Sequence, residues 1–145
     1  DTLLLSAYEK FEPLARKKSI SISISLPDKI IPPCPCDKER IEQVFSILLD
    51  NAISYTPPEG RISLSMEASM ERLSFRVSDN GAGIPDAEKK AVFGRFYRCD
   101  KSHKDKSHFG LGLCIAQEII HMHKGKLWIE DTPGGGATFV VVLNL

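Results

Sequence analysis

The chain has 145 residues, of which 42% are hydrophobic and 26% are charged, and this suffices for one globular domain with a full core. Nineteen basic and nineteen acidic side chains cancel, so no global field favours nucleic acid or an anionic membrane surface. No segment approaches the ~20 apolar residues that span a bilayer, and no signal-peptide pattern is present. We therefore expect a soluble domain that contacts neither nucleic acid nor membrane.

The cysteines and the start of the chain bear on its origin. Neither a disulfide-rich framework nor a zinc-type pattern is formed by the cysteines, which are Cys34, Cys36, Cys99 and Cys114. We therefore expect a reduced, cytoplasmic compartment. The chain starts without an initiator methionine and runs directly into helical pattern, so we expect one domain, residues 1–145, cut from a longer protein. Any membrane anchor of that protein would lie outside this chain.

The first half of the chain combines helical and strand periodicity. The opening residues carry a helical stripe, residues 19–26 alternate Ser with Ile or Leu, and Asp37 is a good N-cap for a helix that ends before Pro57. Residues 62–66 and 73–78 alternate apolar with polar side chains. The helical residues expected to face the core are Leu4, Leu5, Tyr8, Phe11 and Leu14, then Ile41, Val44, Phe45, Leu48, Leu49 and Ala52.

The second half contains an irregular stretch from Tyr97 to Phe109, and loops of that length are typically functional or disordered. A helix from Leu111 to His123 follows, and then strands 126–131 and 138–143 form a hairpin. The expected stripe of this helix is Leu111, Ile115, Ile119 and Met122. The expected order is αββαββ, the irregular stretch, and αββ. Since the strands have one polar face, we expect helices on one side of the sheet only.

A candidate ligand-binding turn, Asp79–Pro85, directly follows the strand at 73–78 and reads Asp-Asn-Gly-Ala-Gly-Ile-Pro. Gly81 and Gly83 permit backbone geometries and close approaches that a Cβ would block. An aspartate held by a rigid strand can accept a hydrogen bond from a planar amine, such as a nucleobase amino group. The same string also marks ordinary turns, so the residues alone leave both interpretations open.

Two further elements carry polar or backbone groups that suit a phosphorylated ligand. Asn51 lies roughly 90° from the centre of its helix's apolar stripe, where its amide either holds Mg²⁺ or bonds neighbouring backbone. Tyr55, one turn on, is expected nearer the core, where it flanks a planar ligand or simply packs. Gly110 and Gly112 open the last helix, whose free N–H groups suit phosphate. Neither a Walker nor a dinucleotide fingerprint is present.

Taken together and in this order, the motifs resemble the catalytic, ATP-binding domain of sensor histidine kinases, a family of the GHKL ATPase superfamily. The similar segments are Gln43–Thr56, Asp79–Pro85, Val92–Arg98, the glycines at 110 and 112, and Gly136–Phe139, which correspond to the N, G1, F and G2 boxes and a terminal strand. They cover nearly the whole chain. The resemblance implies an α+β fold: a two-layer α/β sandwich with a mixed, mostly antiparallel five-stranded sheet and three main helices on one face.

The resemblance also implies roles for individual residues, with ATP and Mg²⁺ as cofactors. Asp79 would accept from the adenine amino group, Asn51 would hold the Mg²⁺ that bridges the phosphates, and Arg98 would contact a phosphate. The stretch from Tyr97 to Phe109 would be the ATP lid. The implied nucleotide-binding residues are Asn51, Tyr55, Asp79, Gly81, Gly83, Ile84, Arg98, Gly110, Leu111, Gly112, Leu113 and Thr138, with Asn51 and Arg98 as catalytic residues.

The implied activity is presentation of the γ-phosphoryl group of Mg·ATP to an acceptor histidine. The four histidines, His103, His108, His121 and His123, lie outside the family's acceptor pattern. The acceptor is therefore expected on a dimerisation domain that precedes Asp1, in a homodimer that later passes the phosphoryl group to a response regulator. Without that domain we expect this chain to be inactive.

Three departures from the family pattern fall at the metal and phosphate end. Ile47 replaces the first Asn of the N box, Ser54 replaces a phosphate-binding Lys, and His108 replaces a glycine before Gly110. Two alternatives therefore stay open: a serine kinase of the anti-sigma-factor type, and a degenerate nucleotide-binding module with a regulatory or docking role. The segment Arg95–Arg98 favours the histidine kinase.

Overall fold

The computed structural model describes residues 2–28, 36–93 and 112–144. Within these ranges the chain forms three α-helices, five strands and two short 3-10 helices. The helices are α1 (Thr2–Lys17), α2 (Lys38–Tyr55) and α3 (Gly112–Met122), and the 3-10 helices are η1 (Asp86–Glu88) and η2 (Ala91–Phe93). The strands are β1 (Ser21–Ser25), β2 (Arg61–Ala68), β3 (Arg72–Asp79), β4 (Lys126–Asp131) and β5 (Ala137–Asn144).

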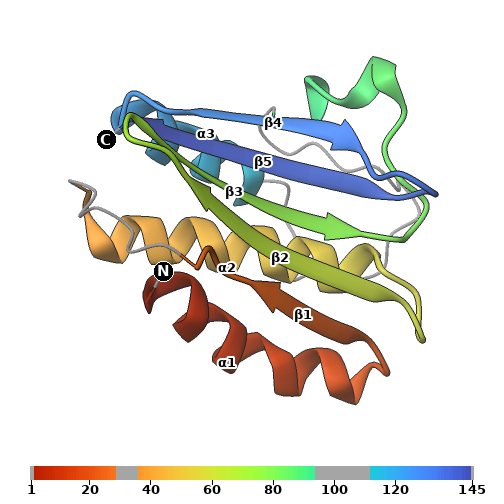
Figure 1. Cartoon of the computed structure of the whole chain (residues 1–145). Helices are drawn as coiled ribbons and strands as arrows, with labels where there is room; N and C mark the ends of the chain where they lie inside the picture. The colour runs from red at the N-terminus through yellow and green to blue at the C-terminus, as the bar shows by residue number, and fades with distance from the viewer. Residues whose placement is uncertain (1, 29–35, 94–111, 145) are drawn as a thin grey trace.

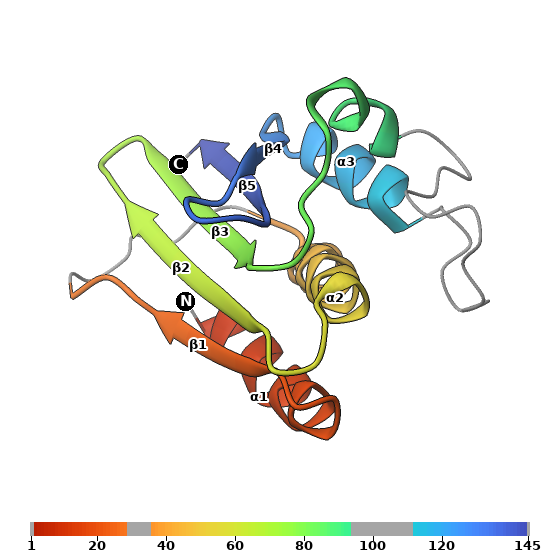
Figure 2. The same cartoon turned by 90° about the vertical axis from the view of Figure 1, so that its right-hand side faces the viewer.

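All five strands form one mixed sheet with the spatial order β1-β2-β3-β5-β4. β1 pairs in parallel with β2, and the other three pairs are antiparallel. The three α-helices lie together against one face of the sheet (Figures 1 and 2). This confirms the expected α+β fold, a two-layer sandwich with helices on one side.

The expected order αββαββ was wrong, because in the described residues a single strand, β1, lies between α1 and α2. The reason is topological: a parallel pair such as β1 and β2 needs a crossover connection, and α2 is that crossover. The hairpin of β4 and β5 was predicted correctly, and its strands begin and end within about one residue of the expected positions.

The central helix is α2, and both of its ends are closed by side chains. As predicted, Asp37 is the N-cap, and its carboxylate accepts a backbone N–H of the first turn. At the other end, the buried Thr56 hydroxyl donates to the carbonyl of Ala52 at 2.6 Å. The Lys18 ammonium donates to the carbonyl of Ile53 at 2.8 Å. These contacts fix the last turn of α2, which carries the candidate residues of the site.

The core lies between α2 and the helix-facing side of the sheet. Leu73, Phe75 and Val77 of β3 are buried on this side because every second residue of a strand points the same way. The rings of Phe45 on α2 and Phe75 on β3 meet edge to face, with centroids 4.5 Å apart and an interplanar angle of 77°. Asp79, two residues beyond Val77, continues this buried row.

Two of the predicted helical stripes are displaced in the structure. In α1, Leu5 and Leu14 are 40% and 47% exposed, whereas Leu4, Ala7, Phe11 and Ala15 face the core. In α3, Ile115 and Met122 are exposed and the buried residues are Ala116, Ile119 and Ile120. Alanines at the contact let the helices approach closely, and a search for large apolar side chains overlooks them.

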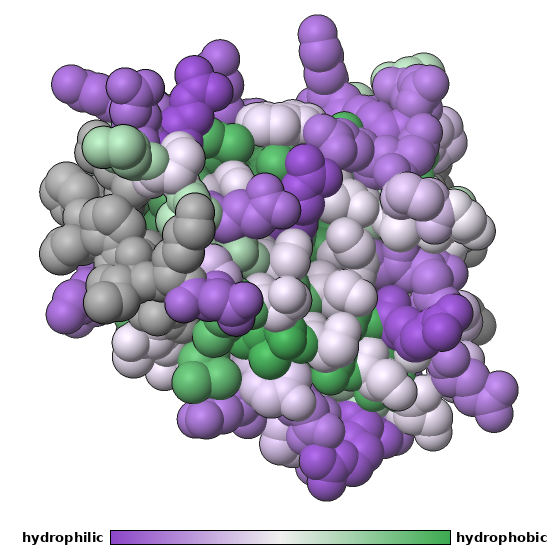
Figure 3. Space-filling view, viewed as in Figure 1, coloured by the Kyte–Doolittle hydropathy of each residue, from purple (hydrophilic) through white to green (hydrophobic). Residues whose placement is uncertain are grey.

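The opposite face of the sheet carries small polar side chains, as Figure 3 shows by its mostly pale surface over the strands. Val140 of β5 is nevertheless 1% exposed, since Arg76 and Trp128 flank it on the neighbouring strands. The Arg76 guanidinium donates to the Glu130 carboxylate at 3.1 Å, and the Trp128 indole N–H donates to it at 2.9 Å.

Among the described residues, no helix is long and apolar enough to span a bilayer.

Candidate functional site

The Asp79 carboxylate is the buried polar group at the end of β3. Its residue is 7% exposed, and its Oδ1 accepts hydrogen bonds from the backbone N–H groups of Gly81 at 3.0 Å and Ala137 at 3.2 Å. Both hydrogen bonds that it accepts within the described residues fall on Oδ1, and Oδ2 accepts none from them. Burial raises the pKa of this carboxyl above its usual range, and the two N–H donors only partly oppose that rise.

The turn after Asp79 packs against the end of the β4–β5 hairpin, backbone against backbone. A Cβ on Gly136 would lie 2.0 Å from the Asp79 carbonyl oxygen, and Gly136 has a φ of +112°. Across the same contact, Gly83 has a φ of +80°, and a Cβ on it would lie 3.2 Å from the Gly136 carbonyl oxygen. Only glycine satisfies both the space and the left-handed backbone here. The two glycines therefore bring the Ala137 N–H to the carboxylate.

Asn51 on α2 and the start of α3 belong to the same region of the helical layer. Asn51 is half-buried at the border of the buried stripe of α2, as expected. Ile47 lies one turn before it on the same side of the helix. A Cβ on Gly112, the first residue of α3, would lie 3.3 Å from Cγ2 of Ile47. The N-terminus of α3 therefore lies beside the turn of α2 that precedes Asn51.

Tyr55 is not placed as expected, and Thr138 lies away from Asp79. Tyr55 was expected nearer the core, but it is 37% exposed, because it ends α2 where the helix leaves the sheet. Thr138 pairs in register with Ser78, whose side chain points to the opposite face of the sheet from Asp79. The Thr138 hydroxyl donates to the Ser78 hydroxyl at 3.0 Å. The structure therefore does not bring Thr138 to the side of Asp79.

The residue that does reach Asp79 from β5 is Ala137, which sequence reasoning missed. Its contribution is a backbone N–H, and a backbone donor leaves no trace in residue type. A signal was present nonetheless, since a run of glycines before a strand marks close backbone approach. Of the other predicted site residues, Ile84 and Leu113 are partly buried and pack against the core.

Several predicted residues lie outside the described ranges. These are Arg98, Gly110, Leu111 and the remainder of the proposed lid, including His103 and His108. Within the described residues, no group of three His, Cys, Asp or Glu side chains is suited to a metal ion. The chemistry of Asn51 still fits Mg²⁺, which accepts amide oxygen and normally binds through few protein groups, waters and substrate phosphates.

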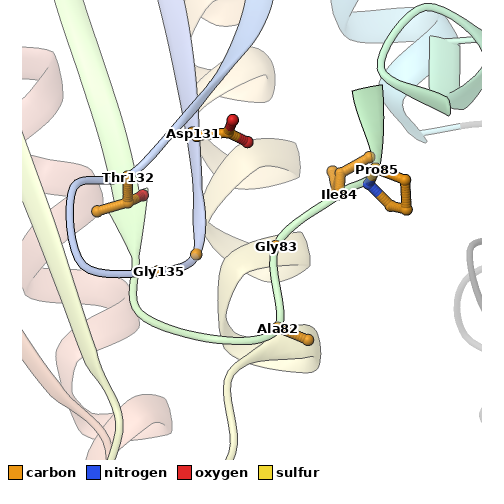
Figure 4. A pocket seen from close by; sticks show the side chains of 8 residues that line it. Ala82, Gly83, Ile84, Pro85, Asp131, Thr132 and Gly135 are labelled. Carbon is orange, nitrogen blue, oxygen red and sulfur yellow. The ribbon is translucent and has the colours of Figure 1, made fainter. Parts of the chain in front are cut away.

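A hollow of about 440 Å³ lies between the Asp79 turn and the hairpin. In Figure 4, Asp131 and Thr132 of the hairpin stand on one side of it, and Ile84 and Pro85 of the turn on the other. Its remaining lining residues are Ala82, Gly83, Gly135 and Gly136. Neither Asp79 nor Asn51 lines this hollow, so it is not the space into which those side chains point.

A protein family described as the histidine kinase-, DNA gyrase B- and HSP90-like ATPases matches residues 36–145. This match covers well over half of the chain. The chain belongs to this family. Membership of the ATPase family implies that the domain binds ATP.

Relatives of this ATPase domain are sensor kinases. The adaptive-response sensory kinase SasA of Nostoc sp. is 40% identical over 109 residues, which cover 72% of this chain and 27% of SasA. The catalytic domain of the histidine kinase ThkA superposes with a TM-score of 0.86 at 29% identity, over 99% of this chain and 90% of that one. The ATPase domain is thus a histidine kinase catalytic domain.

A second structure of ThkA contains the response regulator protein TrrA, and its kinase chain superposes with a TM-score of 0.82 at 28% identity. The match covers 99% of this ATPase domain and 39% of that chain. Among the SasA relatives, the domain spans between 27% and 34% of the full length.

Proposed function

We propose that this domain binds Mg·ATP and presents its γ-phosphoryl group to a histidine on a separate dimerisation domain of the same protein. The observation that carries the proposal is the buried Asp79 carboxylate, whose Oδ1 accepts from two backbone N–H groups while Oδ2 accepts none from the described residues. A carboxylate so oriented accepts a hydrogen bond from an exocyclic amino group. Adenine carries that donor, whereas guanine presents a carbonyl at the same position and is repelled.

The phosphates would lie toward α2 and α3. Asn51 would offer its amide oxygen to Mg²⁺, and the N-terminus of α3 at Gly112 and Leu113 would offer N–H groups to phosphate oxygens. Such an ion, held by Asn51, would supply neutralisation of the negative charge on the phosphates. Arg98, Gly110 and Leu111, outside the described ranges, are proposed as further phosphate contacts on the basis of the family resemblance.

The partners of the domain follow from the same proposal. ThkA, which has this fold, forms a complex with a response regulator. We infer that the present domain serves a longer chain, a homodimer whose dimerisation domain carries the acceptor histidine and which then phosphorylates a response regulator. Cys36 and Cys114 are free thiols, which supports a cytoplasmic position for this domain. Any membrane anchor is proposed to lie in other segments of that protein.

A titration of the domain with Mg·ADP and Mg·GDP tests the nucleotide assignment. We expect ADP to bind at least tenfold more tightly than GDP, because a site with a buried hydrogen-bonding group rejects a ligand that leaves it unpaired. Equal affinity for the two nucleotides would contradict the role of Asp79. The Asp79→Asn variant shows whether the preference comes from this carboxylate.

A phosphotransfer assay separates the kinase from a docking module. Ile47 lies against Gly112 where the family pattern has a polar residue, and this favours a nucleotide pocket without transfer activity as the second candidate. The full-length protein is incubated with ATP labelled at the γ-phosphate. An acid-labile, alkali-stable phosphoprotein is the expected result. Nucleotide binding without a labelled protein would support the docking module instead.

A further inference from the structure

Lys89, which follows η1, is a lysine whose ammonium is largely enclosed by acceptors from two separate segments. Its side chain is only 16% exposed. The ammonium donates to the carbonyl oxygen of Ile84 at 3.0 Å, to Oδ1 of Asp131 at 2.9 Å and to Oδ1 of Asp86. A lysine ammonium has three N–H donors, so these acceptors saturate it.

The acceptors of Lys89 come from the two segments that meet at Asp79, which are the Asp79 turn and the β4–β5 hairpin. Ile84 and Asp86 belong to the segment that continues the Asp79 turn, whereas Asp131 ends β4. Asp131 is the register partner of Ala137, whose N–H donates to the Asp79 carboxylate. Lys89 therefore spans the contact that delivers this N–H.

The contact between the turn and the hairpin should also depend on the positive charge of Lys89. The carboxylates of Asp86 and Asp131 both lie against one Nζ, and they are 90% and 71% exposed. Exposed ion pairs contribute little to overall stability. Without the cation, however, the negative charges of Asp86 in the turn and Asp131 in the hairpin would face each other. Their repulsion would move the turn away from the hairpin.

We propose that Lys89 is a positioning residue for nucleotide binding, which keeps the Ala137 N–H on Oδ1 of Asp79 and so orients Oδ2 toward the base. The inference rests on the proposed function, because the orientation of Asp79 matters for binding only if that carboxylate reads adenine. The chain offers a matched control in Lys90, the next residue, which carries the same charge and is exposed.

The experiment compares Lys89→Met, Lys89→Arg and Lys90→Met with the unaltered domain in a Mg·ADP titration. Lys89→Met keeps the aliphatic stem and removes the charge. We expect it to weaken ADP binding about three- to tenfold, since residues within one contact network couple this strongly. Lys89→Arg restores a cation, and Lys90→Met leaves the contacts of Lys89 intact. The ADP affinity of both variants should therefore stay within about twofold of that of the unaltered domain.

A second measurement, independent of nucleotide, is the backbone amide resonance of Ala137 in the ligand-free proteins. Lys89→Met should shift it, and Lys90→Met should leave it in place. If Lys89→Met does not fold, Asp131→Ala decides by the same two measurements, because it removes one acceptor and leaves the two bonds within the turn.

The outcomes separate this inference from the proposed function. If the unaltered domain does not bind ADP, the proposed function fails and the inference fails with it. If it binds and Lys89→Met binds equally well with an unshifted Ala137 amide, only the role of Lys89 is overturned. Weaker binding with a shifted amide in Lys89→Met, and neither change in Lys90→Met, supports it.

Discussion

The two ends of the proposed nucleotide site are built from different parts of the chain. At the adenine end, the Asp79 carboxylate is held by backbone N–H groups, and the glycines at 83 and 136 let two backbone segments touch. At the phosphate end, the surface depends on side chains, among them Ile47 and Asn51 on α2. The departures from the family pattern, Ile47 among them, fall at the end that depends on side chains.

At the adenine end, we expect the largest loss of stability and of binding from a substitution at Gly136. In Gly136→Ala, the new Cβ would meet the Asp79 carbonyl oxygen at 2.0 Å in a residue with positive φ. The strained backbone costs about 1–3 kcal/mol and the overlap about 1–3 kcal/mol more, so we expect a loss of about 2–6 kcal/mol in the free energy of unfolding. ADP binding should disappear as well, because the Ala137 N–H is pushed away from the carboxylate. Urea unfolding and a Mg·ADP titration measure both.

Gly135→Ala is the matched control for this change. Gly135 has a φ of +119° in the same turn, but a Cβ on it would meet no atom within 4 Å. It should therefore show the backbone cost alone, about 1–3 kcal/mol, and retain ADP binding. If the two variants were equally destabilised, backbone strain would account for everything and the contact with Asp79 would have no part in it.

Asp79→Asn should separate binding from stability at the same end. The amide oxygen can still accept the N–H groups of Gly81 and Ala137, so the turn should stay folded. ADP affinity should fall about tenfold or more, because a charged hydrogen bond to the base is lost. A Mg·ADP titration measures the change, and Asp28→Asn, the same substitution at an exposed residue, should bind normally. Unchanged affinity in Asp79→Asn would remove the adenine assignment.

The pH dependence of the Asp79 carboxyl should have opposite signs for binding and for stability. Its pKa in the folded domain lies above the ordinary value of about 3.9 because of burial. The folded state therefore favours the protonated form, and this contribution to stability is present below about pH 3.9 and lost as the pH rises through the folded pKa. ADP binding needs the carboxylate and should weaken as the pH falls through that pKa. Urea unfolding and titrations between about pH 4 and 7, with Asp79→Asn as the pH-insensitive reference, measure both.

What the sequence predicted, and what it did not, follows the same division between side chains and backbone. The alternation of strands such as 73–78 was enough for the one-sided sheet and for the position of Asp79 at the end of β3. The N-cap at Asp37 was also predicted correctly from the sequence. The Ala137 donor and the Lys89 contacts depend on strand register and on a turn that crosses to a distant hairpin, and periodicity contains neither.

The errors have physical causes too. The helical stripes were assigned to the largest apolar residues, but Ala15 and Ala116 are fully buried because small side chains allow close helix packing. Tyr55 was expected nearer the core, but it lies on the exposed side of the last turn of α2.

At the phosphate end, we expect a polar residue in place of Ile47 to strengthen nucleotide binding. In Ile47→Asn, the amide would stand one helical turn before Asn51, where it can ligand Mg²⁺ or a phosphate. We expect Mg·ADP affinity to rise about two- to fivefold, at a cost of about 1–2 kcal/mol in the free energy of unfolding, because Ile47 packs partly against the core. Titrations in Mg²⁺ and in EDTA measure the metal-dependent part. Ile47→Ala should lose stability without gaining affinity, and an equal gain in both variants would argue against a polar contact.

The smallest expected effect tests whether the start of α3 is open to phosphate. In Gly112→Ala, the new Cβ would lie 3.3 Å from Cγ2 of Ile47. Replacing a helical glycine by alanine is worth about 0.4–1 kcal/mol, and crowding against Ile47 should offset most of it. In the Ile47→Ala background the crowding is absent, so the same substitution should stabilise by about the full amount. Urea unfolding of the four proteins measures this reversal, and in either background Gly112→Ala should change ADP affinity by less than about twofold. A large loss of affinity would mean that this Cβ obstructs the phosphates.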